Sequence, residues 1–215
     1  EKPDIMKMLL LAAISRFFCL GVVLVGLPYM VRTILGLDAK YYGGAESAMA
    51  VAAILGSIAA GLLTGKMKYG RLSFVLAAIG LCIIPAGAVF LLPSGGGIKY
   101  AVIVASFCGM QAAISIFSVF AVSMIQQNTP DDMIGKVMAY TSAITLCAQP
   151  VGQMVYGFLF DGFRGAVYLV LVPTGIVVCI IVLFSRGFLE VFGKQKEEGA
   201  WKFKKISFIL EGAGV

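Results

Sequence analysis

The chain of 215 residues is 60% hydrophobic and only 13% charged, whereas a soluble domain is typically about half apolar and about a quarter charged. This composition excludes an ordinary soluble core and indicates a chain that folds in lipid. The formal net charge is +6, but the basic residues lie between apolar runs and in the tail, which indicates membrane topology rather than nucleic-acid binding.

Six apolar runs are long enough to cross a bilayer, for which a helix needs about 20 mostly apolar residues. Short connections with turn-forming residues separate them. Runs of this length predict helices, because barrel strands would be shorter and would alternate. We therefore expect an all-α integral membrane protein whose transmembrane helices span residues 8–35, 42–65, 72–92, 100–125, 137–160 and 165–185.

The predicted domain organisation is a six-helix membrane domain over residues 1–186 and a cytoplasmic tail over residues 187–215. The tail mixes aromatic and basic residues, so it could lie on the membrane surface as an amphipathic segment or be a disordered solubilising tail. Six crossings place both termini on one side. The positive-inside rule makes that side the cytoplasm, because it carries most basic residues: Lys2, Lys7, Lys66, Lys68, Arg71, Lys136, Arg186 and the tail lysines.

Residues for catalysis are scarce. The chain has no histidine, which removes the commonest general base and metal ligand, and no P-loop motif for nucleotide phosphates. Its five cysteines lie inside apolar runs, which favours buried apolar side chains over disulfides or metal ligands. We expect no enzyme activity, no cofactor and no metal site.

Small residues recur every four positions along the second predicted span. Spacing of this kind lets helix backbones approach closely. The two parallel stripes are Ala48, Ala52, Gly56 and Ala60, and Ala53, Ser57, Gly61 and Gly65.

Two cytoplasmic connections carry a family resemblance. The first contains Gly61, Lys66, Gly70 and Arg71 and resembles the loop motif of the major facilitator superfamily, although Gly65 stands where that motif usually has an acidic residue. Its glycines would allow tight packing where helix meets loop, and its basic residues would cap helix ends and anchor the loop at headgroups.

The second connection contains Pro130, Gly135 and Lys136, and a Pro150-Val151-Gly152 segment follows it. It is similar to the entry into the penultimate helix of drug and macrolide efflux members, where arginine usually stands at the position of Lys136. The resemblance implies the C-terminal six helices of a twelve-helix transporter, with a substrate site near the midplane between two halves. The partner would be an N-terminal six-helix half or a second copy of this chain.

Six polar residues inside the spans are candidates for the substrate pathway. Arg16 lies deep enough to contact an anion or form a gate, or it snorkels to the headgroups. Glu46 could couple protons, or it is an interfacial carboxylate at a helix N-terminus. Two polar pairs could line a cavity or tie helices together: Gln111 with Ser115, and Gln149 with Gln153.

These observations predict a secondary active transporter half in the bilayer, exporting small amphipathic molecules or drugs by proton-coupled alternating access. The expected location is a bacterial inner membrane. The alternative is a non-transporting membrane subunit or a homodimeric pore, although a pore would usually show rings of charge. We expect a small-molecule substrate and no nucleic-acid partner.

Overall fold

The computed structural model describes residues 3–63, 69–93, 95–130, 132–163 and 165–184, and this part of the chain is helical, with no strand. Five of its helices are long and apolar enough to cross a membrane, and a shorter apolar helix follows them. The expected all-α membrane architecture is therefore confirmed at this level. The predicted tail and Lys66 lie outside the described residues. The helices are α1 (Pro3–Gly21), α2 (Ala39–Leu63), α3 (Tyr69–Ala88), α4 (Gly96–Asn128), α5 (Ile134–Gly162) and the helix Tyr168–Phe184.

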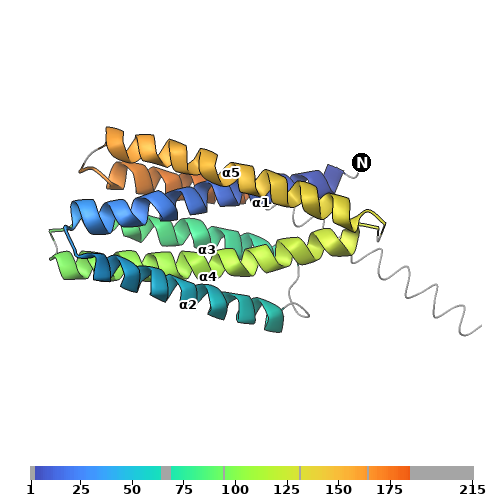
Figure 1. Cartoon of the computed structure of the whole chain (residues 1–215), viewed down its shortest axis with the longest axis horizontal. Coiled ribbons are helices and arrows are strands. Elements are labelled where there is room, and N and C mark those ends of the chain that lie inside the picture. Colours follow the sequence, from blue (N-terminus) through green and yellow to red (C-terminus); the bar gives the residue numbers. More distant parts are fainter. Residues whose placement is uncertain (1–2, 64–68, 94, 131, 164, 185–215) are drawn as a thin grey trace, which may run out of the picture.

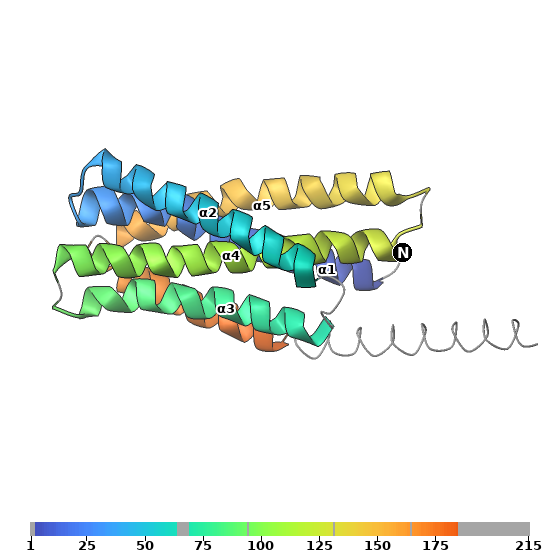
Figure 2. The ribbon, with the colours of Figure 1, turned by 90° about the horizontal axis from the view of Figure 1, so that it is seen from below.

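The helices run antiparallel to their sequence neighbours in one elongated bundle (Figure 1). The beginning of α1, the connection between α4 and α5, and the end of helix Tyr168–Phe184 all lie toward the same end. Figure 2 shows α2 and α5 along one side of the bundle, and α3 with helix Tyr168–Phe184 along the opposite side. Helix α4 packs against both α2 and α3, whereas α1 packs mainly against α5.

The first predicted span is helical to Ile34 but is not a regular α-helix. Two π-helical segments, Val22–Gly26 and Tyr29–Ile34, flank Pro28. Proline has no N–H to donate, and the chain accommodates this loss by widening the helix rather than ending it. Gly36 follows the helix end, and its φ of 63° is the left-handed conformation that glycine adopts most readily just after a helix C-terminus.

Close backbone contacts at small residues hold the bundle together. A Cβ built on Gly56 of α2 would lie 2.5 Å from the carbonyl oxygen of Ala112 in α4. Gly80 of α3 and Gly175 of helix Tyr168–Phe184 face each other, and a Cβ on either would lie 3.0 Å from the other's carbonyl oxygen. Only glycine permits these approaches, which increase the packing contact that drives helix association in lipid.

The two predicted stripes on α2 have different environments. Gly56 and Ala60 of the first stripe are buried, so this stripe forms part of the contact with α4. In the second stripe, Ser57 and Gly61 are exposed. The prediction of close packing is therefore confirmed at Gly56 and Ala60, whereas Ser57 and Gly61 are exposed within the described part of the chain.

Candidate functional site

A cavity of about 130 Å³ lies between α1, α4 and α5. It is in the half of the bundle nearer the connection between α4 and α5, because its lining comes from the C-terminal half of α4 and the first turns of α5. Leu20, Ile114, Phe117 and Val122 form part of its apolar wall. Its polar lining residues are Ser15, Arg16, Ser118, Thr141, Ser142 and Thr145.

Arg16 is the one charged residue that lines this cavity, and its side chain is half-buried. In the described part of the chain Arg16 forms no ion pair. The ion pair found there joins Lys40 and Asp38, 3.6 Å apart on the surface at the opposite end of the bundle. A charged side chain inside a membrane is costly and usually faces a cavity or a partner. Arg16 meets this expectation, because it lines the cavity.

The hydroxyl groups of the cavity fall into two classes. Thr141 donates to the backbone oxygen of Val137 at 2.8 Å, and Thr145 donates to that of Thr141 at 2.7 Å, so both hydroxyl protons are used within α5. Among the described residues, the side chains of Ser118 and Ser142 make no hydrogen bond. These two serines can therefore donate to a ligand.

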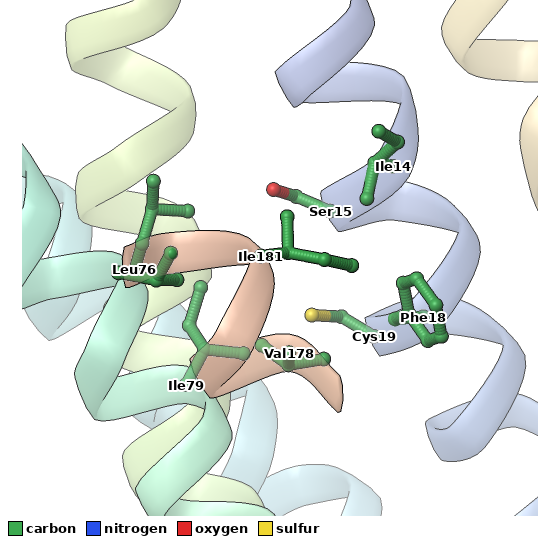
Figure 3. A pocket seen from close by; sticks show the side chains of 9 residues that line it. Ile14, Ser15, Phe18, Cys19, Leu76, Ile79, Val178 and Ile181 are labelled. Atoms are coloured by element: carbon green, nitrogen blue, oxygen red, sulfur yellow. The ribbon is translucent and has the colours of Figure 1, made fainter. Parts of the chain in front are cut away.

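A second, much smaller cavity lies between α1, α3 and helix Tyr168–Phe184, with a volume of about 10 Å³. Figure 3 shows aliphatic side chains around it, including Leu76, Ile79 and Ile181, with Cys19 pointing toward them from α1. Ser15 and Cys19 line both cavities, so this part of α1 separates them. The second cavity has room for about one water molecule and is a packing defect rather than a ligand site.

Gln111 lies on the same face of α4 as Ser118, two helical turns away. Its Oε1 atom is buried and accepts no hydrogen bond from a described residue. Native structures leave few buried polar atoms without a partner. Ser115, half-buried, stands one turn from Gln111 on the same helix. A polar row thus extends from the Arg16 cavity along α4, although neither Gln111 nor Ser115 lines the cavity itself.

The other predicted pathway residues lie apart from this cavity. Gln149 and Gln153 are half-buried on α5, beyond the turns that line it. Glu46 is exposed in the first turns of α2, at the opposite end of the bundle, and accepts a hydrogen bond from Tyr42 at 2.7 Å. Of the six candidates, Arg16 lines the cavity, and Gln111 and Ser115 continue its polar lining along α4. Glu46, Gln149 and Gln153 lie elsewhere.

The residues of the two loop motifs are mostly exposed. A Cβ on Gly61 or Gly135 would meet no described atom within 4 Å, so the expected close packing at Gly61 stays a prediction. Pro130 and Lys136 are also exposed, and Gly70 and Arg71 lie in the first turn of α3. Lys66 is outside the described residues.

Comparisons with known proteins identify no relative. No family model matches the sequence, and no curated protein or solved structure matches the chain. The resemblance to the major facilitator superfamily therefore stays a prediction.

Five polar lining residues of the cavity were not singled out from the sequence: Ser15, Ser118, Thr141, Ser142 and Thr145. A signal for them exists, because Thr141 and Thr145 are one turn apart in an apolar span and Ser118 is two turns from Gln111. It is weak, since such hydroxyls often bond only to their own helix, as both threonines do. Among the described residues, no group of His, Cys, Asp or Glu could hold a metal ion.

Proposed function

We propose that this chain is one half of a secondary transporter of the major facilitator type. It works by alternating access, and the polar cavity at Arg16 forms part of its substrate pathway. The proposed transport is proton-coupled export of small amphipathic molecules across a bacterial inner membrane. The second half is an N-terminal six-helix unit or another copy of the chain.

The observation that carries the proposal is the asymmetry of the bundle. Of the five long helices, α2 and α5 are the least buried, and α5 is also the least apolar. The exposed side of α5 is largely apolar, with Leu146, Met154 and Phe158, whereas the polar Gln149 and Gln153 of the same helix are half-buried. The low burial of α2 and α5, together with two glutamines on the least apolar helix, favours a second half that packs against this side of the bundle and encloses a pathway with it.

The polar lining of the cavity also supports a transport function. Polar and ionisable groups inside a membrane bundle usually mark a substrate or ion pathway. Arg16, Ser118 and Ser142 line the cavity, and the buried Oε1 of Gln111 continues the polar row along α4. A purely structural bundle would gain little from this arrangement, because each unpaired polar group costs free energy in lipid.

The distribution of charge supports an orientation. The exposed Lys136 lies at the end of the bundle that contains the beginning of α1, and Lys40 and Lys99 lie at the other. In the sequence, further basic residues adjoin the beginnings of α1 and α3 and the end of helix Tyr168–Phe184: Lys2, Lys7, Lys66, Lys68, Arg71 and Arg186. Because these exceed the basic residues of the other side, we propose that the first end is cytoplasmic by the positive-inside rule. The Arg16 cavity then lies in the cytoplasmic half of the membrane.

The test uses everted membrane vesicles from bacteria that express the full chain. An imposed proton gradient should drive uptake of at least one of three fluorescent probes: ethidium as a cation, Nile red as a neutral molecule and fluorescein as an anion. A protonophore should abolish this uptake, and vesicles without the chain should lack it. The exposed substitution Arg32→Gln is the matched control and should leave it unchanged.

The homodimeric pore predicts a different result. Purified chain in a planar bilayer would then carry a salt-dependent current with no dependence on a proton gradient. That current, together with no gradient-driven uptake of any probe, would replace the transporter proposal with the pore.

A further inference from the structure

We propose that the cavity between α1, α4 and α5 binds the anionic group of a small amphipathic ligand, with Arg16 as its counter-charge. The group is a phosphate, sulfonate or carboxylate. This inference rests on the proposed function, because it names the chemical class of ligand taken by the same site.

The described lining of the cavity carries a net positive charge. Arginine brings a positive charge to the cavity, and among the described residues no aspartate or glutamate lines it. Arg16 also has no ion-pair partner among the described residues. A bound anion would supply the missing negative charge in a medium where an isolated cation is strongly disfavoured.

The hydrogen-bond donors of the cavity also favour an anion. Arginine presents its N–H donors in a planar fork that matches phosphate and carboxylate oxygens. Ser118 and Ser142 add two hydroxyl donors that no described residue engages, while Thr141 and Thr145 give their protons to backbone oxygens. The described lining of the cavity thus combines one cation with free donors and contains no carboxylate, which suits an anion and repels a cation.

The size and the remaining lining restrict the ligand further. A volume of about 130 Å³ is below the roughly 300–1,000 Å³ of clefts that enclose drug-sized molecules. The cavity therefore holds a charged group rather than a whole ligand. Leu20, Phe117 and Val122 in its wall provide apolar contacts for the carbon atoms next to that group, which is why we infer an amphipathic anion.

Two sources can supply such a group, a freely diffusing anion or the headgroup of an anionic lipid. Both share the same chemistry at Arg16. They differ in the number of acyl chains and in whether the ligand leaves the membrane, so a binding experiment with one-chain and two-chain probes separates them.

The experiment is isothermal titration calorimetry of the full chain in phosphatidylcholine nanodiscs, with empty nanodiscs as the background. The probe is hexyl phosphate, and hexylammonium and hexanol are its matched cationic and neutral controls. We expect saturable binding of hexyl phosphate alone. Because a hydrogen bond to a charged group contributes about 1.5–3 kcal/mol, Arg16→Gln should weaken this binding by roughly 10- to 100-fold.

Three further variants keep the result interpretable. Arg16→Lys retains the charge and should keep part of the affinity, and the exposed Arg32→Gln should bind as the unaltered chain does. The double substitution of Ser118→Ala with Ser142→Ala leaves Arg16 in place and should weaken binding by several fold. This double variant tests the site even if Arg16→Gln fails to fold.

The outcomes are distinct. Equal binding of hexylammonium and hexyl phosphate, or unchanged affinity in Arg16→Gln, would overturn the anion site and leave Arg16 as a residue that snorkels to the headgroups. Binding of dihexanoyl phosphatidic acid without binding of hexyl phosphate would support the site and identify a lipid headgroup as its source. Binding without gradient-driven transport would contradict only the proposed function, and transport with no anion binding would contradict only this inference.

Discussion

Gly56 of α2 faces the backbone of Ala112 in α4 so closely that a Cβ on Gly56 would lie 2.9 Å from the Ala112 Cα atom. The contact joins the lightly buried α2 to the centre of the bundle. It also allows a direct test of the small-residue stripe, because another glycine of α2, Gly61, faces open space.

Replacing Gly56 with alanine should destabilise the bundle by about 1–3 kcal/mol, the usual cost of overpacking a close contact. Gly61→Ala should instead be neutral or stabilising by up to about 1 kcal/mol, because alanine favours helix more than glycine does. The measurement is the unfolding transition of each variant in detergent micelles. Equal destabilisation by both substitutions would contradict the assignment of Gly56 to the interface with α4.

The hydrogen bond between Tyr156 of α5 and Thr174 of helix Tyr168–Phe184 should contribute less to the stability of the bundle than the close contact at Gly56. The buried Tyr156 hydroxyl lies 3.2 Å from Thr174 Oγ1, which in turn donates to the backbone oxygen of Val170. Tyr156→Phe should cost about 0.5–1.5 kcal/mol of unfolding free energy, because the threonine keeps its own acceptor. Tyr140→Phe, at an exposed tyrosine of the same helix, is the control and should change nothing.

Native cysteines can report what covers the open side of α5. Cys147 is exposed on this helix, whereas Cys19 is 1% exposed. If the open side borders an aqueous pathway, a charged methanethiosulfonate reagent should label Cys147 in intact membranes and leave Cys19 unlabelled, because the reaction requires a thiolate in contact with water. Labelled protein would be counted by mass spectrometry with Cys147→Ala as the blank. Absence of labelling at Cys147 would indicate lipid or a tightly packed partner on this side.

Gln149→Leu tests whether the polar residues of α5 serve transport. If Gln149 lines the pathway, the substitution should reduce gradient-driven uptake in everted vesicles several fold without lowering the amount of chain in the membrane, since leucine inserts more readily than glutamine. The uptake rate is divided by the quantity of chain on an immunoblot. Full activity in Gln149→Leu would remove this residue from the pathway.

Glu46→Gln addresses proton coupling. Glu46 is exposed, lies far from the Arg16 cavity and accepts a hydrogen bond from Tyr42, a bond that the glutamine Oε1 could also accept. We therefore expect proton-driven uptake to stay within about twofold of the unaltered rate, since an exposed surface substitution usually has a small effect. Loss of the proton dependence, with uptake down a concentration gradient retained, would instead show that Glu46 carries the coupled proton.

The apolar runs predicted the helices well, because the length of a membrane crossing is set by the bilayer rather than by tertiary contacts. The packing of the stripe with Gly56 and Ala60 was also predictable, since small residues every four positions mark one helix face. The cavity was not. Arg16 was visible as an isolated charge, but its neighbours Ser118 and Ser142 come from two other helices. Nothing in their local sequence says which helices will meet, so only the assembled bundle identifies the group.

The π-helical turns on either side of Pro28 should let the first span tolerate the loss of one residue, which the other described spans should not. A π turn holds one residue more than an α turn over nearly the same rise. Deleting one residue between Val22 and Ile34 could therefore convert a π turn to an α turn and leave both ends of the span in register. The same deletion within α4 would rotate every later side chain by about 100° and turn Ser118 away from Arg16. Length variation among natural homologues of this chain should accordingly concentrate around Pro28 and be rare in α4.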